Sequence, residues 1–144
     1  MRINTFDAYS RLSPLQINRL VNFLFSNQDC NKLSKNSLRK AILYAAKERP
    51  GFGGYIFCLE EKDTTIGALV INRTGMEDYI PENMLVTMVV AKDFKNQGWE
   101  DKLLDYAISY CKGDIGVYIK EPKTTQTFRE HGFEHNNLEM RLKQ

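Results

Sequence analysis

The residues with the clearest potential for chemistry lie in one segment, residues 85–110. A run of apolar residues, 85–91, gives way to a polar loop, 92–97, and then to Gly98. An amphipathic helical pattern begins directly after this glycine. A strand, a tight turn and a helix N-terminus in this order bring unpaired backbone N–H groups and the positive end of the helix dipole together. The segment is therefore suited to binding a phosphate group.

Two helices are predicted before this segment. Ser13 followed by Pro14 is typical of a helix start, since serine caps the first turn and proline fits the first helical position. Apolar residues then recur at helical spacing and predict a helix over 14–26. Ser34 is the predicted cap of a second helix, which Pro50 and the glycine after it bring to an end.

Three strands are predicted next. Residues 54–60 and 65–72 flank a short polar turn and form a predicted antiparallel hairpin. Residues 84–90 are almost continuously apolar, which indicates a strand that is buried on both faces.

The remaining elements follow the helix that begins after Gly98. A strand is predicted over 114–120 and a short helix over 124–131, with Gly132 at its end. Residues 133–143 are predicted to form one or two strands, because their apolar residues alternate with polar ones.

The order of these elements predicts an α+β (α/β) fold, with a mixed, mostly antiparallel central sheet and helices on both faces. The strand–helix–strand unit at 84–120 most simply makes its two strands parallel, through a right-handed crossover. A length of 144 residues is that of one ordinary domain, so residues 1–144 are predicted to form a single domain.

Three segments of the sequence, residues 90–100, 127–133 and 66–70, resemble motifs of the GNAT superfamily of N-acetyltransferases. The acyl-CoA-binding segment of that family runs Val-x-Pro-x-x-(Arg/Gln)-x-x-Gly-x-(Gly/Ala), and residues 90–100 read VAKDFKNQGWE. The family closes on a segment that runs roughly hydrophobic-Tyr-x-x-x-Gly-Phe, and residues 127–133 read TFREHGF. Residues 66–70, IGALV, look like its third strand. The resemblance covers residues 65–143.

The resemblance implies acetyl transfer to an amine, with acetyl-CoA as co-substrate and no metal ion. The thioester carbonyl would accept a hydrogen bond from a backbone N–H at Met88, Val89 or Val90, where a donor stabilises the developing oxyanion. The pantetheine would lie between strands 84–90 and 114–119. The other cofactor-binding residues that the resemblance implies are the phosphate loop and the position of the family's tyrosine: Lys95, Asn96, Gln97, Gly98, Trp99, Glu100 and Phe128.

The sequence departs from the family at four positions that bear on activity. Lys95 replaces the motif's Arg or Gln and keeps a cation without the planar fork. Glu100 replaces the second small residue; its carboxylate favours the helix end, and it either points outward or points into the loop and repels an anion. Phe128 stands where the family commonly has a proton-donating Tyr, and Met84 where some members have a carboxylate base.

Other side chains are candidates for proton transfer or substrate binding. Glu82 could act as the base, or be a solvated residue at a strand end. Tyr118 could donate a proton to the leaving thiolate, or be a packed strand aromatic. His131 lies at a helix C-terminus, which favours a capping role. Residues 77–79 could bind a cationic amine, or form an ordinary exposed loop.

Composition and charge argue against several classes of protein. The net charge is +2 with acids and bases interspersed, so the concentrated basic face of a nucleic-acid-binding protein is missing. The N-terminal residues lack the apolar segment of a secretory signal, and no apolar run is long enough to span a membrane. The three cysteines are widely spaced, unlike those of a zinc or redox site. We expect a cytoplasmic monomer or homodimer without nucleic-acid or membrane partners.

Three functions remain open at this point. The first is an acetyl-CoA-dependent N-acetyltransferase whose acceptor is a small-molecule or peptide amine. The second is a GNAT-fold protein that has lost catalysis and acts as a binding or regulatory module, for which Glu100, Phe128 and Met84 argue. The third is an unrelated α+β binding domain in which Gly98 is only a turn residue.

Overall fold

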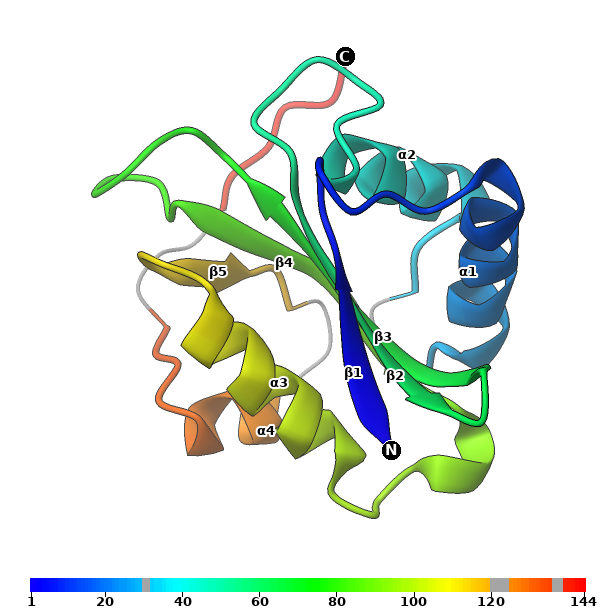
Figure 1. The fold of residues 1–144 in the computed structure, drawn as a ribbon. Coiled ribbons are helices and arrows are strands. Elements are labelled where there is room, and N and C mark those ends of the chain that lie inside the picture. Colours follow the sequence, from blue (N-terminus) through cyan, green and yellow to red (C-terminus); the bar gives the residue numbers. More distant parts are fainter. Residues whose placement is uncertain (30–31, 120–124, 136–138) are drawn as a thin grey trace.

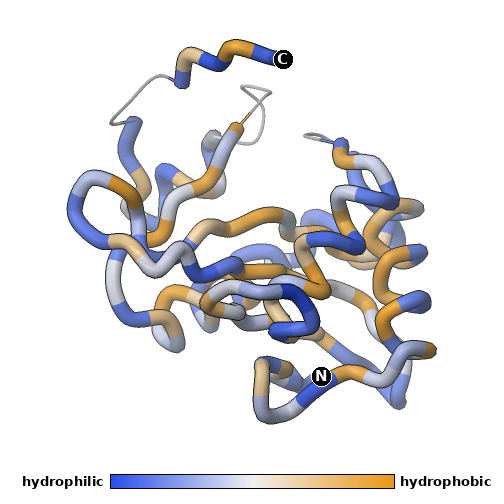
Figure 2. The backbone as a smooth tube through the Cα atoms, turned by 90° about the horizontal axis from the view of Figure 1, so that it is seen from above, coloured by the Kyte–Doolittle hydropathy of each residue, from blue (hydrophilic) through white to orange (hydrophobic). Residues whose placement is uncertain are grey.

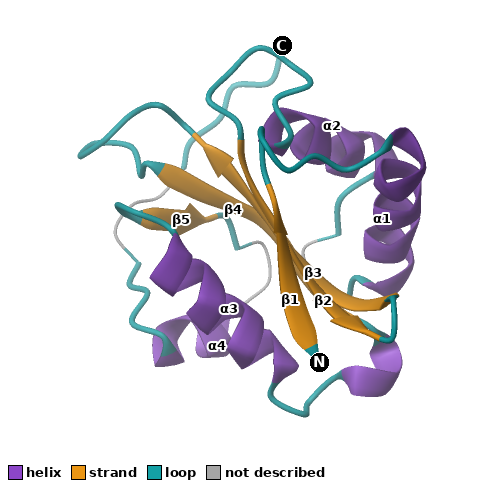
Figure 3. Cartoon of the chain, viewed as in Figure 1, coloured by secondary structure: helices purple, strands orange, loops and turns teal. Residues whose placement is uncertain are grey.

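The computed structural model describes residues 1–29, 32–119, 125–135 and 139–144, and its elements surround one sheet (Figures 1 and 3). The strands are β1 (Arg2–Phe6), β2 (Gly54–Glu61), β3 (Thr64–Arg73), β4 (Asn83–Val90) and β5 (Ile115–Val117). The helices are α1 (Pro14–Asn27), α2 (Lys35–Ala45), the 3-10 turn η1 (Lys92–Phe94), α3 (Trp99–Tyr110) and α4 (Thr125–Glu130).

Within the described residues, the sheet has five strands in the order β1-β2-β3-β4-β5. All neighbouring strands are antiparallel except β4 and β5, which are parallel. Helices α1 and α2 cover one face, and α3 and α4 cover the other (Figure 1). The predicted mixed sheet with helices on both faces is confirmed, and so is the parallel pair around α3.

The predicted β2–β3 hairpin is also confirmed. It closes through Lys62 and Asp63, whose φ angles are 49° and 64°. Two consecutive residues in the left-handed region form the tight turn whose twist matches that of the flanking strands.

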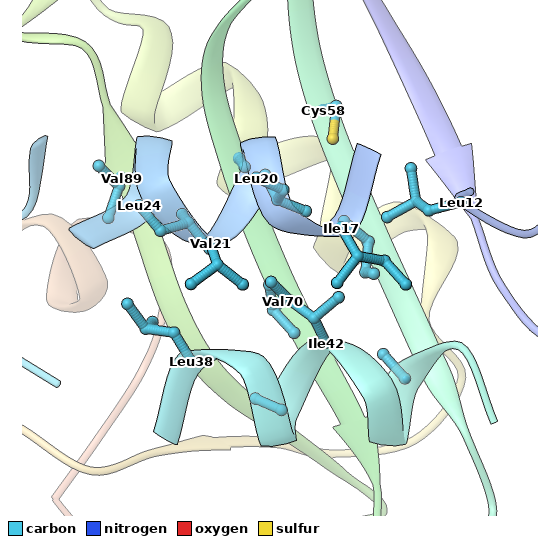
Figure 4. Close-up of a cluster of buried hydrophobic side chains, with 14 residues drawn as sticks. Leu12, Ile17, Leu20, Val21, Leu24, Leu38, Ile42, Cys58, Val70 and Val89 are labelled. Atoms are coloured by element: carbon cyan, nitrogen blue, oxygen red, sulfur yellow. The ribbon is translucent and has the colours of Figure 1, made fainter. Parts of the chain in front are cut away.

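Apolar side chains form a separate core on each face of the sheet. On the α1–α2 side, Val70 of β3 packs with Val21 and Ile42 from the two helices, and all three side chains are fully buried (Figure 4). On the α3–α4 side, Leu69 packs in the same cluster as Leu103 of α3. Leu69 and Val70 belong to different cores because consecutive strand residues point to opposite faces.

The first two helices start at the predicted caps. The Ser13 hydroxyl accepts a hydrogen bond from the Gln16 N–H over 3.2 Å, and the Gln16 side chain accepts one from the Ser13 N–H over 2.7 Å. This reciprocal pair fixes the start of α1. Ser34 caps α2 by accepting from the Ser37 N–H over 3.0 Å.

Helix α2 ends at Ala45, earlier than the predicted stop at Pro50. Lys47 takes a φ of 59° and donates its N–H to the carbonyl oxygen of Tyr44 over 3.0 Å. The chain therefore leaves the helical path before the proline is reached.

The sequence does not predict β1, although this strand forms one edge of the sheet. It pairs with β2 from Arg2↔Glu60 to Phe6↔Ile56. Ile3 packs against the α3–α4 core and Phe6 against the α1–α2 core. In a strand of five residues, so few apolar positions give no recognisable alternation.

Strand β5 is shorter than predicted. It pairs with β4 through Asn83↔Ile115, Met84↔Gly116 and Leu85↔Val117. The start of β5 is held by Asn83, which is 2% exposed and donates from Nδ2 to the carbonyl oxygens of Lys112 (2.8 Å) and Asp114 (3.2 Å). Residues 118–119 continue without strand pairing, and the predicted end at residue 120 lies outside the described residues.

The prediction of one or two strands over 133–143 is wrong for the residues that the structure describes there, 133–135 and 139–144. Met140 is 97% and Leu142 is 83% exposed, and the last residues stand away from the body of the protein (Figure 2). Alternating side chains form a strand only where a neighbouring strand supplies hydrogen bonds and a surface to cover. Residues 136–138 lie outside the described residues.

Candidate active site

Strand β4 carries an extra residue at Val86, and β5 pairs no further than the residue before it. The β3–β4 register shifts between Val70 and Ile71, which pair with Thr87 and Leu85, so Val86 is a β-bulge. A bulge bends its strand locally. Because β5 pairs no further than Leu85, no described strand covers the adjoining edge of β4 beyond the bulge.

Two backbone amides of β4 point toward this unpaired edge. The Ala91 N–H donates to the Ile66 carbonyl oxygen of β3 over 2.8 Å. Because hydrogen-bond direction alternates along an antiparallel strand, the Val89 N–H also faces β3, and the N–H groups of Met88 and Val90 face away from it. Of the three predicted donors to a thioester carbonyl, Met88 and Val90 therefore face the unpaired edge and Val89 does not.

The loop after β4 reverses the chain and leads into the N-terminus of α3. Asn96 and Gly98 both adopt left-handed conformations, with φ angles of 62° and 84°. Gly98 is the N-cap of α3 and supplies no side-chain hydrogen bond to the first turn. The first N–H groups of a helix have no intrahelical acceptor, so they remain available to an anion. A Cβ at position 98 would meet no atom beyond its chain neighbours within 4 Å, so the space beside Gly98 is open.

The side chains of this loop hold the loop itself. Gln97 donates from Nε2 to the Asp93 carbonyl oxygen over 3.1 Å. The Lys95 ammonium donates to the Asn27 carbonyl oxygen over 2.9 Å and pairs with the Asp29 carboxylate. Lys95 therefore anchors the loop to the end of α1 with its charge already paired, whereas the motif led us to expect a cation for phosphate.

Trp99 and Glu100 begin α3 in different surroundings. The Trp99 ring packs against the α3–α4 core, as its helical spacing with Leu103 predicts, and Lys102 Nζ lies 5.0 Å from the ring centroid. Glu100 is half-buried in the first turn and forms no ion pair with any described residue. Its carboxylate therefore occupies the same positive potential that an anionic ligand would use.

Phe128 is a core residue on α4. Its side chain is 7% exposed and meets the Phe133 ring edge-on, with the centroids 5.2 Å apart. Helix α4 is joined to α3 by His131, whose Nδ1 lies 2.8 Å from the Thr127 carbonyl oxygen and whose Nε2 lies 3.1 Å from the Asp105 carboxylate. The α4 side of the site thus supplies packing at Phe128 and a link between helices at His131.

Glu82 lies at the start of β4, far from the loop that follows the strand. Its carboxylate accepts a hydrogen bond from the Asp114 N–H over 3.1 Å, and a Cβ added to Gly113 would lie 1.6 Å from it. At roughly 3.3 Å per strand residue, Glu82 is about 20 Å from Met88. The structure therefore does not bring this predicted base to the amides of Met88 and Val90.

Tyr118 lies at the point where β5 parts from β4. Its neighbours Val117 and Ile119 pack against the α3–α4 core, so the Tyr118 side chain points toward the α1–α2 side. It is 61% exposed. Met84 is on the same side, with its sulfur 3.0 Å from where a Cβ on Gly116 would lie.

The described residues offer no metal site and no membrane span. No group of three or more His, Cys, Asp or Glu side chains among them could hold a metal ion. None of the helices in the described ranges is long and apolar enough to cross a membrane. The loop at 77–79 is exposed.

The structure also forms a groove that the sequence does not predict. The groove is open, has a volume of about 470 Å³, and lies between α2, the loop after α2 and the strands β3 and β4. It is lined by Ser37, Lys40, Ala41, Tyr44, Arg49, Pro50, Asn72 and Val86. Spacings of three and four residues place the α2 members on one helix face, which the sequence could have revealed. Only the tertiary structure adds the residues from the loop and the two strands.

No protein-family model matches the sequence, and no curated protein matches it. The fold does match solved structures. A GNAT-family acetyltransferase from Streptococcus pneumoniae is 12% identical over 99% of this chain and 98% of its own, with a TM-score of 0.66. The ribosomal-protein-S18-alanine N-acetyltransferase from Escherichia coli is 11% identical over 94% of this chain and 80% of its own, with a TM-score of 0.64.

A transcriptional regulator from Bacillus halodurans is also similar, with 15% identity over 98% of this chain and 100% of its own and a TM-score of 0.64. At such identities the likeness concerns the fold alone. The similarity extends over nearly the whole chain, and the mostly antiparallel sheet with helices on both faces that the described residues form is consistent with it. The chain therefore has the fold of the GNAT acetyltransferases.

Proposed function

We propose that this protein transfers an acetyl group from acetyl-CoA to the amine of a small molecule or peptide. The observation that carries the proposal is the unpaired edge of β4. There the N–H groups of Met88 and Val90 face away from β3, on the strand that leads into the N-terminus of α3. The amides of β4 suit the acyl and pantetheine part of acetyl-CoA, and the loop amides around Gly98 suit its phosphates.

The chemistry is a nucleophilic displacement at the thioester carbon. The amine nitrogen forms a bond to this carbon, the carbonyl oxygen becomes an oxyanion, and the carbon–sulfur bond then breaks to release the CoA thiolate. A backbone N–H of Met88 or Val90 stabilises the oxyanion because its hydrogen bond strengthens as charge develops. The amine loses one proton during the reaction and the thiolate gains one.

Tyr118 is the better placed of the two candidate groups for proton transfer. It lies where β5 parts from β4, whereas Glu82 is bonded at the far end of the strand. Phe128 has no proton to donate and lies in the core. In this proposal Tyr118 protonates the thiolate, and solvent takes the proton of the amine. Tyr118→Phe then lowers the turnover number and leaves acetyl-CoA binding unchanged; an unchanged turnover number removes Tyr118 from this role.

The decisive experiment is acetyl-CoA binding. A ligand that binds only the folded state raises the melting temperature by mass action, by an amount that grows with its concentration. We expect millimolar acetyl-CoA to raise the melting temperature by several degrees, and desulfo-CoA, which keeps the phosphates, to do so as well. If neither compound changes the melting temperature, the proposal is overturned.

A second candidate function is a GNAT-fold regulator that binds an acyl-CoA without transferring the acyl group. Two observations favour it: Phe128 is buried without a hydroxyl, and the similar structure from Bacillus halodurans is a transcriptional regulator. Binding of acetyl-CoA without release of CoA in the presence of a broad set of amines would favour this second function.

A further inference from the structure

We propose that the groove between α2 and the bulge of β4 is the acceptor site and that it selects amines that also carry an anionic group. The proposal rests on the acetyl transfer proposed above and deepens it by naming the class of acceptor. It begins from the position of Val86, which lines the groove and is the extra residue of β4. The groove therefore adjoins the strand whose Met88 and Val90 amides face the thioester position.

The charge of the groove has one sign. Lys40 and Arg49 line it, and no carboxylate is among its lining residues. Both cations are exposed, and neither forms an ion pair within the described ranges of the chain. Glu48, the acid next to Arg49, is instead paired with Arg11 over 3.1 Å. Two uncompensated cations beside a groove attract a carboxylate or a phosphate.

The wall that carries Arg49 is held against the sheet. The Tyr44 hydroxyl donates to the Arg73 carbonyl oxygen over 2.6 Å and accepts from the Phe52 N–H over 3.4 Å. A Cβ on Gly51 would lie 2.5 Å from the Tyr44 ring, so the loop after α2 packs directly on this side chain. The loop that carries Arg49 is therefore packed on, and hydrogen-bonded to, the Tyr44 side chain.

Asn72 gives the groove a polar group that the protein does not use. It lines the groove, and its buried Oδ1 has no hydrogen-bond partner in the described part of the chain. Such an atom is uncommon in a folded protein. A half-turn of the amide exchanges the positions of oxygen and nitrogen, so either group can be the one that faces the groove. The groove thus offers two cations for an acid, and the Asn72 amide lies opposite Met84 of β4.

The test uses pairs of amines that differ in one charge. Glycyl-aspartate is compared with glycyl-asparagine, and phosphoethanolamine with ethanolamine, so that the two arms separate a carboxylate from a phosphate. Binding of each compound is measured by calorimetry without acetyl-CoA, and acetylation is then measured with it. We expect the anionic member of at least one pair to bind at least tenfold more tightly and to have the lower KM.

Three charge-reversal variants test whether the preference for the anionic amine depends on the groove. Lys40→Glu and Arg49→Glu are expected to remove the preference for the anionic member and to raise its KM with little change in kcat. Arg19→Glu, on the exposed side of α1, makes the same change in net charge away from the groove and is expected to keep the preference. Circular dichroism confirms that each variant is folded.

The outcomes separate this inference from the proposed function. If acetyl-CoA binds but both members of every pair bind equally, or if Arg19→Glu acts like Lys40→Glu, the inference is overturned and acetyl transfer stands. If the anionic preference depends on Lys40 and Arg49 but acetyl-CoA does not bind, the groove is an anion site and its role as acceptor site is overturned with the proposed function.

Discussion

The Lys95 ammonium donates to the carbonyl oxygen of Asn27, the last residue of α1, over 2.9 Å. This contact joins the candidate phosphate loop to a helix on the opposite face of the sheet. It also gives Lys95 a structural task that the acyl-CoA motif does not describe. This side chain ties the loop to α1, and the helix that follows the loop begins at Gly98 without a side-chain cap.

Lys95→Met is expected to lower the free energy of unfolding by about 1–2 kcal/mol, because the Asn27 carbonyl and the Asp29 carboxylate lose a charged donor. Acetyl-CoA affinity should change by less than about threefold, since the ammonium is already paired. Urea denaturation and calorimetry measure the two effects. Lys92→Met, at an exposed position of the same loop, is the control and should leave stability unchanged within about 0.5 kcal/mol. A large loss of affinity with unchanged stability would show that Lys95 binds the phosphates.

Gly98→Ala is expected to cost about 1 kcal/mol of stability, because alanine is strained at a φ of 84° although a Cβ there meets nothing. Gly132→Ala is a matched control, since Gly132 has a φ of 93° and equally open space. Both variants should therefore melt at similar, slightly lower temperatures. Only Gly98→Ala should also weaken acetyl-CoA binding, and equal binding by the two variants would argue against the loop as the phosphate site.

Glu100→Gln is expected to tighten acetyl-CoA binding. Removing one negative charge near a bound phosphate is worth about 1 kcal/mol in a solvent-exposed site, roughly a fivefold lower Kd. Asp101→Asn serves as control, because the Asp101 carboxylate is exposed and lies 3.7 Å from His131 Nε2 on α4. Calorimetry at low and high salt measures both, and the Glu100 effect should shrink with salt. Unchanged affinity in Glu100→Gln would place this carboxylate outside the site.

Cys111 is expected to react slowly with iodoacetamide at pH 8. Burial raises the pKa of its thiol from 9.0 to about 11, and Arg73 lowers it only in part. A rise of two units leaves roughly one hundredth of the thiolate that an ordinary cysteine has at this pH. The rate should climb with pH until it levels off near pH 11, and peptide mapping by mass spectrometry follows it. A rate that levels off near pH 9 would contradict the burial of this thiol.

Much of the architecture follows from the sequence because it depends on local patterns. Ser13 and Ser34 each start a helix by accepting a hydrogen bond from the amide three residues later, and the β2–β3 hairpin closes through its own turn. In the segment from β4 through Gly98 into α3, the apolar periodicity and the glycine are both visible within a short stretch of sequence. The sequence therefore predicts the parallel β4–β5 pair and the candidate phosphate loop.

The predictions that the structure does not bear out share one cause: the structure or contacts of each segment depend on residues far away in the sequence. The alternation over 133–143 predicts strands, yet the residues described there pair with no strand. The short β1 forms a strand because it pairs with β2. The sequence suggests that Glu82 could act as a base, but in the structure its carboxylate accepts a hydrogen bond from the Asp114 backbone N–H.

What the sequence by itself determined is the set of elements, their order and the chemistry available in the loop, because caps, turns and periodicity act within a few residues. The tertiary structure decided which groups face one another. It bonded Lys95 to Asn27, turned the amides of Met88 and Val90 toward an edge that β5 leaves unpaired, and assembled Lys40, Arg49 and Val86 around one groove. These arrangements depend on sheet register and helix packing, which no short stretch of the chain encodes.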